Sequence, residues 1–164
     1  MKKSIHSTYS GLILNNIEGS IQTHSAPETK RVAKELGTAI LESPKRKGAV
    51  VFALKGELGA GKTSFVQGLA KGLGVKENVL SPTFLIVKSY KLRAKNYKLL
   101  YHIDCYRLKT SKELLQLEWK EIVGDPNNIV AVEWADRVKP IIPKDALWIS
   151  FSYGEEDTRA IRFR

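Results

Sequence analysis

The sequence is poor in cysteine and has no long apolar run. Cys105 is the single cysteine among 164 residues, so no internal disulfide can form, which fits a reducing compartment. No apolar run approaches the length of a membrane span. Residues 1–14 also lack the sustained apolar segment and small-residue cleavage site of a signal peptide. These absences predict a cytoplasmic protein with no membrane partner.

Acidic residues are also scarce. The chain has 17 Asp and Glu against 27 Lys and Arg, which gives a net charge of +10. Such an excess favours a polyanionic partner, either nucleic acid or an acidic protein, although a solvated basic surface without a partner fits the charge equally well. The basic residues gather in three stretches: SPKRKG at 43–48, KSYKLRAKNYK at 88–98 and TRAIRFR at 158–164.

One stretch that is present carries a specific chemical motif. GELGAGKT, residues 56–63, satisfies G-x-x-x-x-G-K-[ST] and follows the valine-rich run at 49–54. Glycines let successive backbone N–H groups close around phosphate oxygens, and a following helix adds partial positive charge. Lys62 is expected to reach the β- and γ-phosphates, and the Thr63 hydroxyl is expected to ligate Mg²⁺. The alternative is a turn that only links a strand to a helix. The flanking elements favour a nucleoside triphosphate site.

The apolar patterns predict a sheet with helices around it. A helix at 25–43 should be capped by Ser25 with Glu28 as a capping box, and further helices are expected from Ser64 to about 73 and at 111–119, the latter capped by Ser111. Strands are predicted at 17–25, 49–54, 84–90, 97–106, 128–134, 143–153 and 158–164.

Two pairs of these strands should form antiparallel hairpins, 84–90 with 97–106 and 143–153 with 158–164, the second turning at 154–157. Together with a parallel P-loop core, they predict an α/β, three-layer P-loop NTPase-like fold whose mixed parallel/antiparallel sheet is flanked by helices. The length has room for one domain. We expect a single domain over residues 20–164, preceded by a poorly ordered extension at 1–19.

Two carboxylates stand at the ends of apolar strands. Mg²⁺ on a nucleotide takes a carboxylate ligand from a neighbouring strand, and both Asp104 and Glu133 qualify by position. Either residue alone can instead face solvent or cap a helix. His102 shares a strand face with Asp104, where a packed or hydrogen-bonded role is favoured over a catalytic one.

The tetrapeptide SPTF, residues 81–84, follows the P-loop helix. Pro82 stiffens this turn, and the hydroxyls of Ser81 and Thr83 can face a γ-phosphate, as switch loops do in other P-loop enzymes. The alternative is a turn that only starts the next strand.

Four segments in this order, GELGAGKTSFVQGLAKGLG, SPTF, YHIDCYRL and VEWADR, resemble the bacterial TsaE proteins over about residues 20–164. The resemblance implies a cytoplasmic ATPase that uses ATP and Mg²⁺ and acts with the TsaD and TsaB proteins. That system makes threonylcarbamoyladenosine beside the anticodon of tRNAs that read codons beginning with A. TsaE proteins do not perform the transfer, and their ATP cycle supports turnover or assembly of the complex. Because no arginine finger is evident within the P-loop region and Arg159 is the only matched candidate, we expect the ATPase to be weak alone and stimulated by its partners. We expect tRNA to be contacted through the complex.

The resemblance also assigns residues. Thr63 and Glu133 match the Mg²⁺ ligands, and Asp104, Lys62 and Thr83 are the implied catalytic residues. The residues implied to contact the nucleotide are Ala26, Pro27 and Thr29 beside the adenine, Gly59, Ala60, Gly61, Lys62, Thr63 and Ser64 at the phosphates, and Trp134 and Arg159. Cys105 stands where the family usually has leucine, and the first 16 to 20 residues have no counterpart.

Two other functional classes remain open from the residues alone. One is a small-molecule kinase, which also combines a short chain with a P-loop, although no arginine-rich lid helix is visible. The other is a nucleotide-regulated protein that binds nucleic acid through the basic hairpin around residues 88–98.

Overall fold

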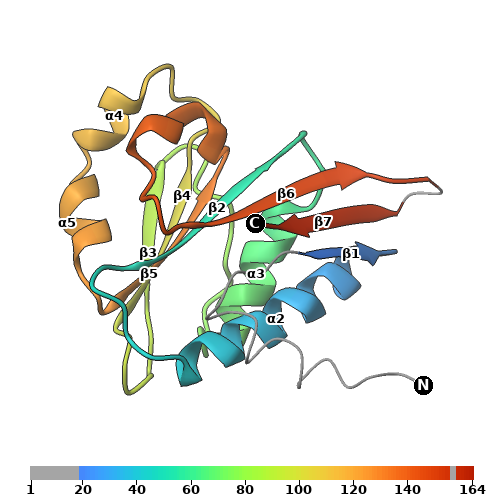
Figure 1. Cartoon of the computed structure of the whole chain (residues 1–164), viewed down its shortest axis with the longest axis horizontal. Coiled ribbons are helices and arrows are strands. Elements are labelled where there is room, and N and C mark those ends of the chain that lie inside the picture. The colour runs from blue at the N-terminus through green and yellow to red at the C-terminus, as the bar shows by residue number, and fades with distance from the viewer. Residues whose placement is uncertain (1–18, 156–157) are drawn as a thin grey trace.

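A computed structural model describes residues 19–155 and 158–164. It contains a seven-stranded sheet with helices on both faces (Figure 1). The strands are β1 (Gly19–Thr23), β2 (Val50–Gly56), β3 (Val87–Lys91), β4 (Leu99–Asp104), β5 (Asn128–Glu133), β6 (Leu147–Tyr153) and β7 (Arg159–Phe163). The helices are α2 (Ala26–Glu42), α3 (Lys62–Gly72), α4 (Ser111–Leu115), α5 (Trp119–Gly124) and the 3₁₀ helix η1 (Ala135–Ile141). Residues 1–18 of the expected N-terminal extension lie outside the described part.

The sheet is mixed, as predicted. Its strand order is β1-β7-β6-β2-β5-β4-β3. The four central strands β6, β2, β5 and β4 are parallel to one another. The outer strands β3, β7 and β1 each pair antiparallel with their neighbours, which confirms both predicted hairpins. Two residues of the predicted second turn, 156–157, lie outside the described residues.

Strands β2 and β5, at the middle of the sheet, are buried on both faces because helices cover each side. In β2, Phe52 and Leu54 pack on one face with α2 and α3, while Val51 and Ala53 pack on the other with α4, α5 and η1. This alternation follows from the two-residue period of a strand. Every residue of β5 is buried. Parallel strands covered on both faces read as continuous apolar runs, which is why the sequence revealed them.

Helices α2 and α3 cross at close range through glycines. A Cβ added to Gly37 would lie 2.6 Å from the Leu69 carbonyl oxygen. Cβ atoms on Gly68 and Gly72 would collide with the carbonyl oxygens of Lys30 and Lys34. The two backbones therefore touch without side chains between them, which fixes the position of α3 and of the loop before it.

The start of α2 confirms Ser25 as its cap, but the predicted capping box is not formed, because the Glu28 carboxylate bonds His24 and not Ser25. The Ser25 hydroxyl accepts a hydrogen bond from the Glu28 N–H at 3.2 Å, and the Glu28 carboxylate accepts one from the His24 N–H at 2.7 Å. Among the described residues, no helix combines the length and apolar character needed to cross a membrane.

Several predicted elements differ from the structure, among them the strand predicted at 143–153, which begins only at Leu147. The predicted helix at 111–119 is interrupted, because Glu118 adopts a left-handed conformation (φ 57°) between α4 and α5. Its cap is Thr110 rather than Ser111, since Thr110 and Glu113 form the reciprocal capping box. The strand predicted from residue 84 begins only at Val87, after a turn in which the Ile86 N–H bonds the Pro82 carbonyl at 2.6 Å.

Candidate functional site

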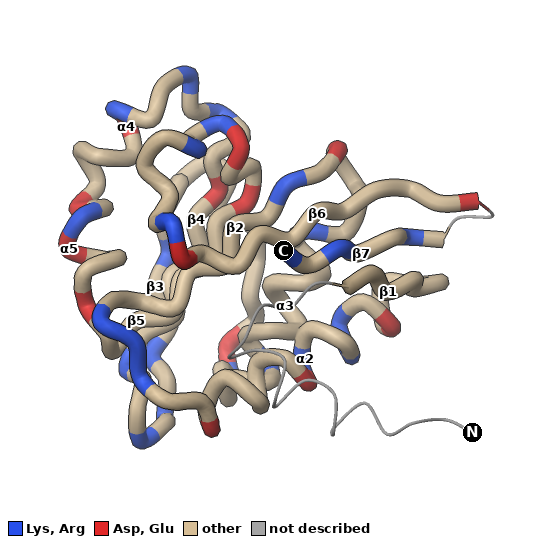
Figure 2. Tube along the Cα trace, in the orientation of Figure 1, with Lys and Arg blue, Asp and Glu red and all other residues tan. Residues whose placement is uncertain are grey.

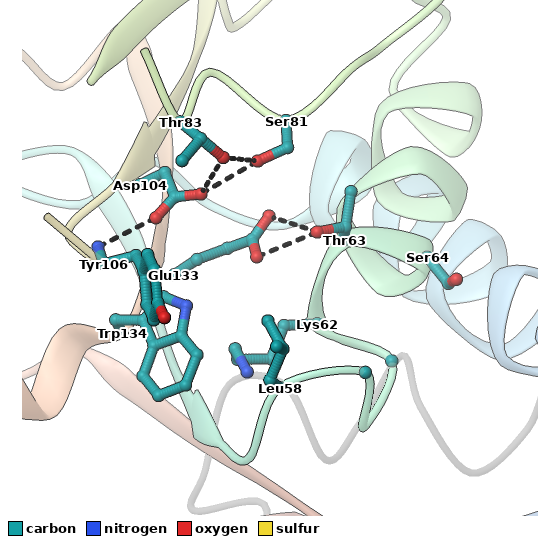
Figure 3. Close-up of a pocket in the computed structure, with 12 residues that line it drawn as sticks. Leu58, Lys62, Thr63, Ser64, Ser81, Thr83, Asp104, Tyr106, Glu133 and Trp134 are labelled. Atoms are coloured by element: carbon teal, nitrogen blue, oxygen red, sulfur yellow. Dashed lines mark hydrogen bonds between the residues drawn. The ribbon is translucent and has the colours of Figure 1, made fainter. Parts of the chain in front are cut away.

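A cleft opens where the central parallel strands end. The P-loop follows β2, while Glu133 and Asp104 close β5 and β4, and the strand register pairs these two carboxylate residues directly. Ligands of open α/β sheets bind at this carboxyl edge. The cleft measures about 270 Å³ (Figure 3), and its lining is Leu58, Gly59, Gly61, Lys62, Thr63, Ser64, Ser81, Thr83, Asp104, Tyr106, Glu133 and Trp134.

The loop before α3 needs its glycines for two separate reasons. Gly61 caps α3 in a left-handed conformation (φ 107°), which favours glycine over residues with a Cβ. Gly59 also has a positive φ (76°), and a Cβ there would lie 2.7 Å from the Tyr153 hydroxyl. That hydroxyl donates to the Leu58 carbonyl at 2.9 Å, so β6 supports the loop from behind. The helix begins at Lys62, two residues before the predicted start.

Lys62 folds back onto its own loop. Its Nζ donates to the carbonyl oxygens of Gly56 at 2.7 Å and Glu57 at 2.8 Å. The same ammonium lies 4.0 Å from the centroid of the Trp134 ring, a cation–π contact. Burial lowers the pKa of Lys62, although the nearby carboxylates of Glu133 and Asp104 oppose that shift. The Lys62 ammonium group is therefore held at the cleft by two neutral carbonyl groups and an indole ring, and a bound anion can take their place.

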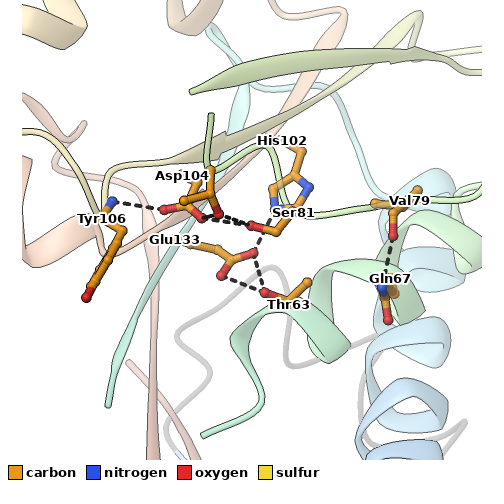
Figure 4. A network of polar contacts seen from close by, with 9 residues as sticks. Thr63, Gln67, Val79, Ser81, His102, Asp104, Tyr106 and Glu133 are labelled. Carbon is orange, nitrogen blue, oxygen red and sulfur yellow. Dashed lines mark hydrogen bonds and ion pairs between the residues drawn. The ribbon is translucent and has the colours of Figure 1, made fainter. Parts of the chain in front are cut away.

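Thr63 and Glu133 meet as the sequence predicted for a metal site. The Thr63 hydroxyl lies 3.0 Å from Oε1 and 2.9 Å from Oε2 of Glu133. On its other side, Glu133 Oε1 lies 2.7 Å from Nε2 of His102, which is fully buried (Figure 4). The carboxylate is thus oriented from both sides, and His102 has the hydrogen-bonded role that its position favoured.

The SPTF segment is tied to the end of β4. Asp104 Oδ2 accepts hydrogen bonds from the hydroxyls of Ser81 at 2.8 Å and Thr83 at 3.0 Å, while Oδ1 accepts from the Tyr106 N–H at 2.9 Å. These contacts bring the predicted switch-like residues to the cleft (Figures 3 and 4). Just beyond them, Ile86 holds a left-handed conformation (φ 65°), which is strained for a β-branched residue.

The donor set fits a hard divalent cation. The Thr63 hydroxyl and the Glu133 and Asp104 carboxylates present oxygen, which Mg²⁺ prefers. Within residues 19–155 and 158–164, no three Asp, Glu, His or Cys side chains group closely enough to hold a metal by themselves. This pattern suits Mg²⁺, which usually keeps one or two protein ligands and takes the others from water and phosphate.

Arg159 lies behind the P-loop. A Cβ on Gly61 would lie 3.4 Å from Arg159 Cδ and 3.9 Å from Thr29 Cγ2. The Arg159 Nε atom is buried and has no hydrogen-bond partner among the described residues. Arg159 and Thr29 therefore stand beside the loop without lining the cleft.

The other predicted nucleotide contacts vary in position. Ala60 is fully buried under the loop, whereas Ser64 and Trp134 line the cleft. Ala26 and Pro27 lie in the first turn of α2 and are absent from the lining. Their contact with an adenine stays a prediction.

The sequence reasoning did not select Leu58 or Tyr106. Both line the cleft, and the Tyr106 ring lies 5.1 Å from the Trp134 ring. Arg137 stacks on both aromatic residues, with its guanidinium carbon 5.3 Å from the Tyr106 ring and 5.5 Å from the Trp134 ring. In the sequence, these residues are marked only by lying within the segments GELGAGKT, YHIDCYRL and VEWADR. Their side chains meet through the fold, and such a meeting produces no periodic pattern in the sequence.

A central strand that runs into a P-loop and helix, inside a mixed sheet, defines a P-loop NTPase-like α/β protein. The crystal structure of Bacillus subtilis YdiB matches this fold with a TM-score of 0.67 and 32% sequence identity, covering 90% of this chain and 84% of that one. The family described as "Threonylcarbamoyl adenosine biosynthesis protein TsaE" matches residues 23–161. The chain therefore belongs to the TsaE family.

Proteins named tRNA threonylcarbamoyladenosine biosynthesis protein TsaE are similar along most of the chain. The Bacillus subtilis protein is 37% identical over 142 residues, which cover 87% of this chain and 82% of that protein. The Treponema pallidum protein is 35% identical over 139 residues, or 85% of this chain and 95% of its own length. The Nostoc protein is 41% identical over 112 residues, and the match covers 66% of each chain.

Proposed function

We propose that this protein is a cytoplasmic, Mg²⁺-dependent ATPase that supports threonylcarbamoyladenosine modification of tRNA together with the TsaD and TsaB proteins. The observation that carries the proposal is the Thr63 hydroxyl held against the Glu133 carboxylate at the mouth of a P-loop. Family membership supplies the pathway, because the relatives are named for it.

In the proposed mechanism, each residue of the cleft has a separate role. Lys62 exchanges the Gly56 and Glu57 carbonyls for β- and γ-phosphate oxygens, while the N–H groups of the loop and of the α3 terminus surround the phosphates. Thr63 and Glu133 hold Mg²⁺, which neutralises charge on the phosphates when bound. Asp104, oriented by Ser81 and Thr83, positions the attacking water.

The proposed ATPase is slow by itself. None of the described residues that line the cleft is an arginine. In related phosphoryl transfers, a missing arginine at the γ-phosphate costs about 10³–10⁵ in rate. We expect the TsaD–TsaB complex to raise the rate by ordering the SPTF segment or Arg159 around the phosphate.

ATP binding by calorimetry in Mg²⁺ tests the first part. Lys62→Ala should weaken affinity at least about tenfold, since a hydrogen bond to a charged group contributes roughly 1.5–3 kcal/mol. Unchanged affinity in a folded variant would remove the P-loop assignment.

Release of phosphate, measured with and without TsaD, TsaB and tRNA, tests the second part. Partner-dependent stimulation supports the proposal. Fast turnover by the lone protein, unaffected by partners, refutes it. Transfer of labelled phosphate to a small molecule would instead make the protein a kinase.

A further inference from the structure

Two basic stretches that are far apart in the sequence meet at one end of the sheet. Residues 43–49 lead into β2, and residues 92–98 connect β3 to β4. Asn127, just before β5, contacts both stretches. Its side-chain oxygen accepts a hydrogen bond from Lys45 Nζ at 2.5 Å, and its carbonyl accepts one from the Lys98 N–H at 2.8 Å.

Figure 2 shows the basic residues of both stretches at the same side of the molecule, at the lower left of the view. We call this surface the basic end, defined by Lys45, Lys47, Lys91, Arg93, Lys95 and Lys98. All six side chains are exposed, while Leu92 and Tyr97 between them are buried and anchor the hairpin. Neither residues 43–48 nor residues 88–98 include an Asp or Glu. Among the described residues, none of these six side chains forms an ion pair. Their neighbour Arg46 does form one, with Asp145 at 3.7 Å.

The basic end lies at the opposite edge of the sheet from the cleft. Strands β2, β4 and β5 start at the basic end and finish at the P-loop, Asp104 and Glu133. The seven residues of β2 alone span roughly 20 Å at about 3.3 Å per residue. This exceeds the Debye length of about 8 Å at physiological salt, so charge changes at the basic end leave the electrostatics of the cleft nearly untouched.

We propose that the basic end binds the phosphate backbone of RNA directly. An interface with an acidic protein is less well supported, because protein interfaces rely on apolar or aromatic anchors at their centre. The large exposed apolar side chains of the described residues, such as Leu58, Phe84 and Leu85, all lie outside the basic end. Tyr90 and Tyr97 are buried, so the described residues of the basic end offer no aromatic platform for stacking bases. The contact is therefore to the backbone and does not read sequence. The choice of tRNA as the RNA rests on the proposed function.

The test is fluorescence anisotropy of a labelled, unmodified tRNA transcript with the full chain, at several KCl concentrations. The variant Lys91→Glu/Arg93→Glu/Lys95→Glu removes three basic groups from the basic end. The control Lys109→Glu/Lys112→Glu/Lys120→Glu makes the same change in net charge at exposed positions on and beside α4 and α5. We expect the first variant to lose about tenfold or more in affinity at low salt. Its slope of log K against log salt should fall by about 2–3, or roughly 0.7–0.9 for each lost contact. The control should retain most of the affinity and the slope.

Three outcomes would overturn the inference: no RNA binding by the wild-type chain, equal losses in the two variants, or unchanged RNA binding by the first variant with loss of TsaD–TsaB capture. The last would assign the basic end to an acidic protein. Thermal melting and the milder Lys91→Gln/Arg93→Gln/Lys95→Gln variant check that a loss does not come from unfolding. Mg²⁺-ATP binding, measured in parallel, should be equal in all of these proteins. Absence of nucleotide binding in the wild-type chain would refute the proposed ATPase, but it would not contradict RNA binding at the basic end.

Discussion

His102 Nε2 and Glu133 Oε1 lie 2.7 Å apart, and both side chains are buried. A carboxylate can only accept, so His102 donates through Nε2–H, and its buried Nδ1 has no hydrogen-bond partner among the described residues. The bond leaves the second carboxylate oxygen, Oε2, facing Thr63. His102 thereby orients the group that we propose as a metal ligand without touching the cleft itself.

His102→Asn should raise the Mg²⁺ concentration needed for nucleotide binding by about 10–100-fold, the usual effect of losing a hydrogen bond to a metal ligand. The shorter Asn side chain cannot reach Glu133, whereas His102→Gln can place an amide N–H near the position of Nε2. We therefore expect the Gln variant to keep most of the Mg²⁺ response. Calorimetry of nucleotide binding across a Mg²⁺ series measures the effect, and the same titration in chelator is the control. A purely structural role would change the metal-free affinity as much as the metal-dependent one.

Glu133→Gln and Asp104→Asn should separate metal binding from hydrolysis. The first change removes the negative charge beside Thr63, so Mg²⁺-dependent nucleotide binding should weaken about tenfold or more. The second keeps an oxygen that can accept from the Tyr106 N–H, so binding should persist while hydrolysis is lost. Binding isotherms and single-turnover phosphate release report the two effects. Reversed phenotypes would exchange the roles of these residues.

Gly68→Ala should destabilise the fold by about 1–3 kcal/mol, because its methyl group would collide with the Lys30 carbonyl in the neighbouring helix. Urea unfolding measures the change. Gly124→Ala is the matched control, since a Cβ there meets no atom within 4 Å, and alanine favours a helix more than glycine does. Equal stabilities of the two variants would show that α2 and α3 are not locked by backbone contact.

The Cys105 thiol should be unreactive in the folded protein. Burial, followed by the charge of Asp104, raises the pKa of Cys105 to about 12, so the thiolate is scarce near neutral pH. Ellman's reagent at about pH 8 should label the native chain far more slowly than the urea-unfolded chain, in which the pKa returns to an ordinary value near 8.5. Rapid labelling of the native chain would show that this part of the core opens readily.

The sequence predicted best what short-range patterns encode. The P-loop, the buried runs of β2 and β5 and the carboxylates that end β4 and β5 each follow from residues adjacent in the chain. Parallel strands place such ends at one edge, so the meeting of Thr63 with Glu133 was also predictable.

What escaped prediction depends on contacts between distant segments. Residues 84–86 are apolar and favour a strand, yet Phe84 is 83% exposed and Leu85 is 70% exposed. Hydrogen bonds from Ser81 and Thr83 to Asp104 hold the chain in a turn there, and no local pattern reveals them. The break at Glu118 also lies beside a long-range contact, since the buried ring of Trp119 donates to the Ile141 carbonyl at 3.1 Å.

The backbone contact between α2 and α3 has a consequence for how the protein can respond to nucleotide. Gly68 and Gly72 leave no side-chain layer that could deform where α3 meets Lys30 and Lys34 of α2, so the two helices should move together as one rigid body. If adenine lies near Ala26 and the phosphates near Lys62, the distance between these two ends of the nucleotide is fixed by the scaffold. The SPTF segment, on the opposite side of the site, can then adjust more easily. In the described part of the chain, only the hydroxyl hydrogen bonds of Ser81 and Thr83 connect it to Asp104 at the end of β4. Any difference between ATP-bound and ADP-bound states should appear there, beside the exposed Phe84 and Leu85, where a partner protein can detect it.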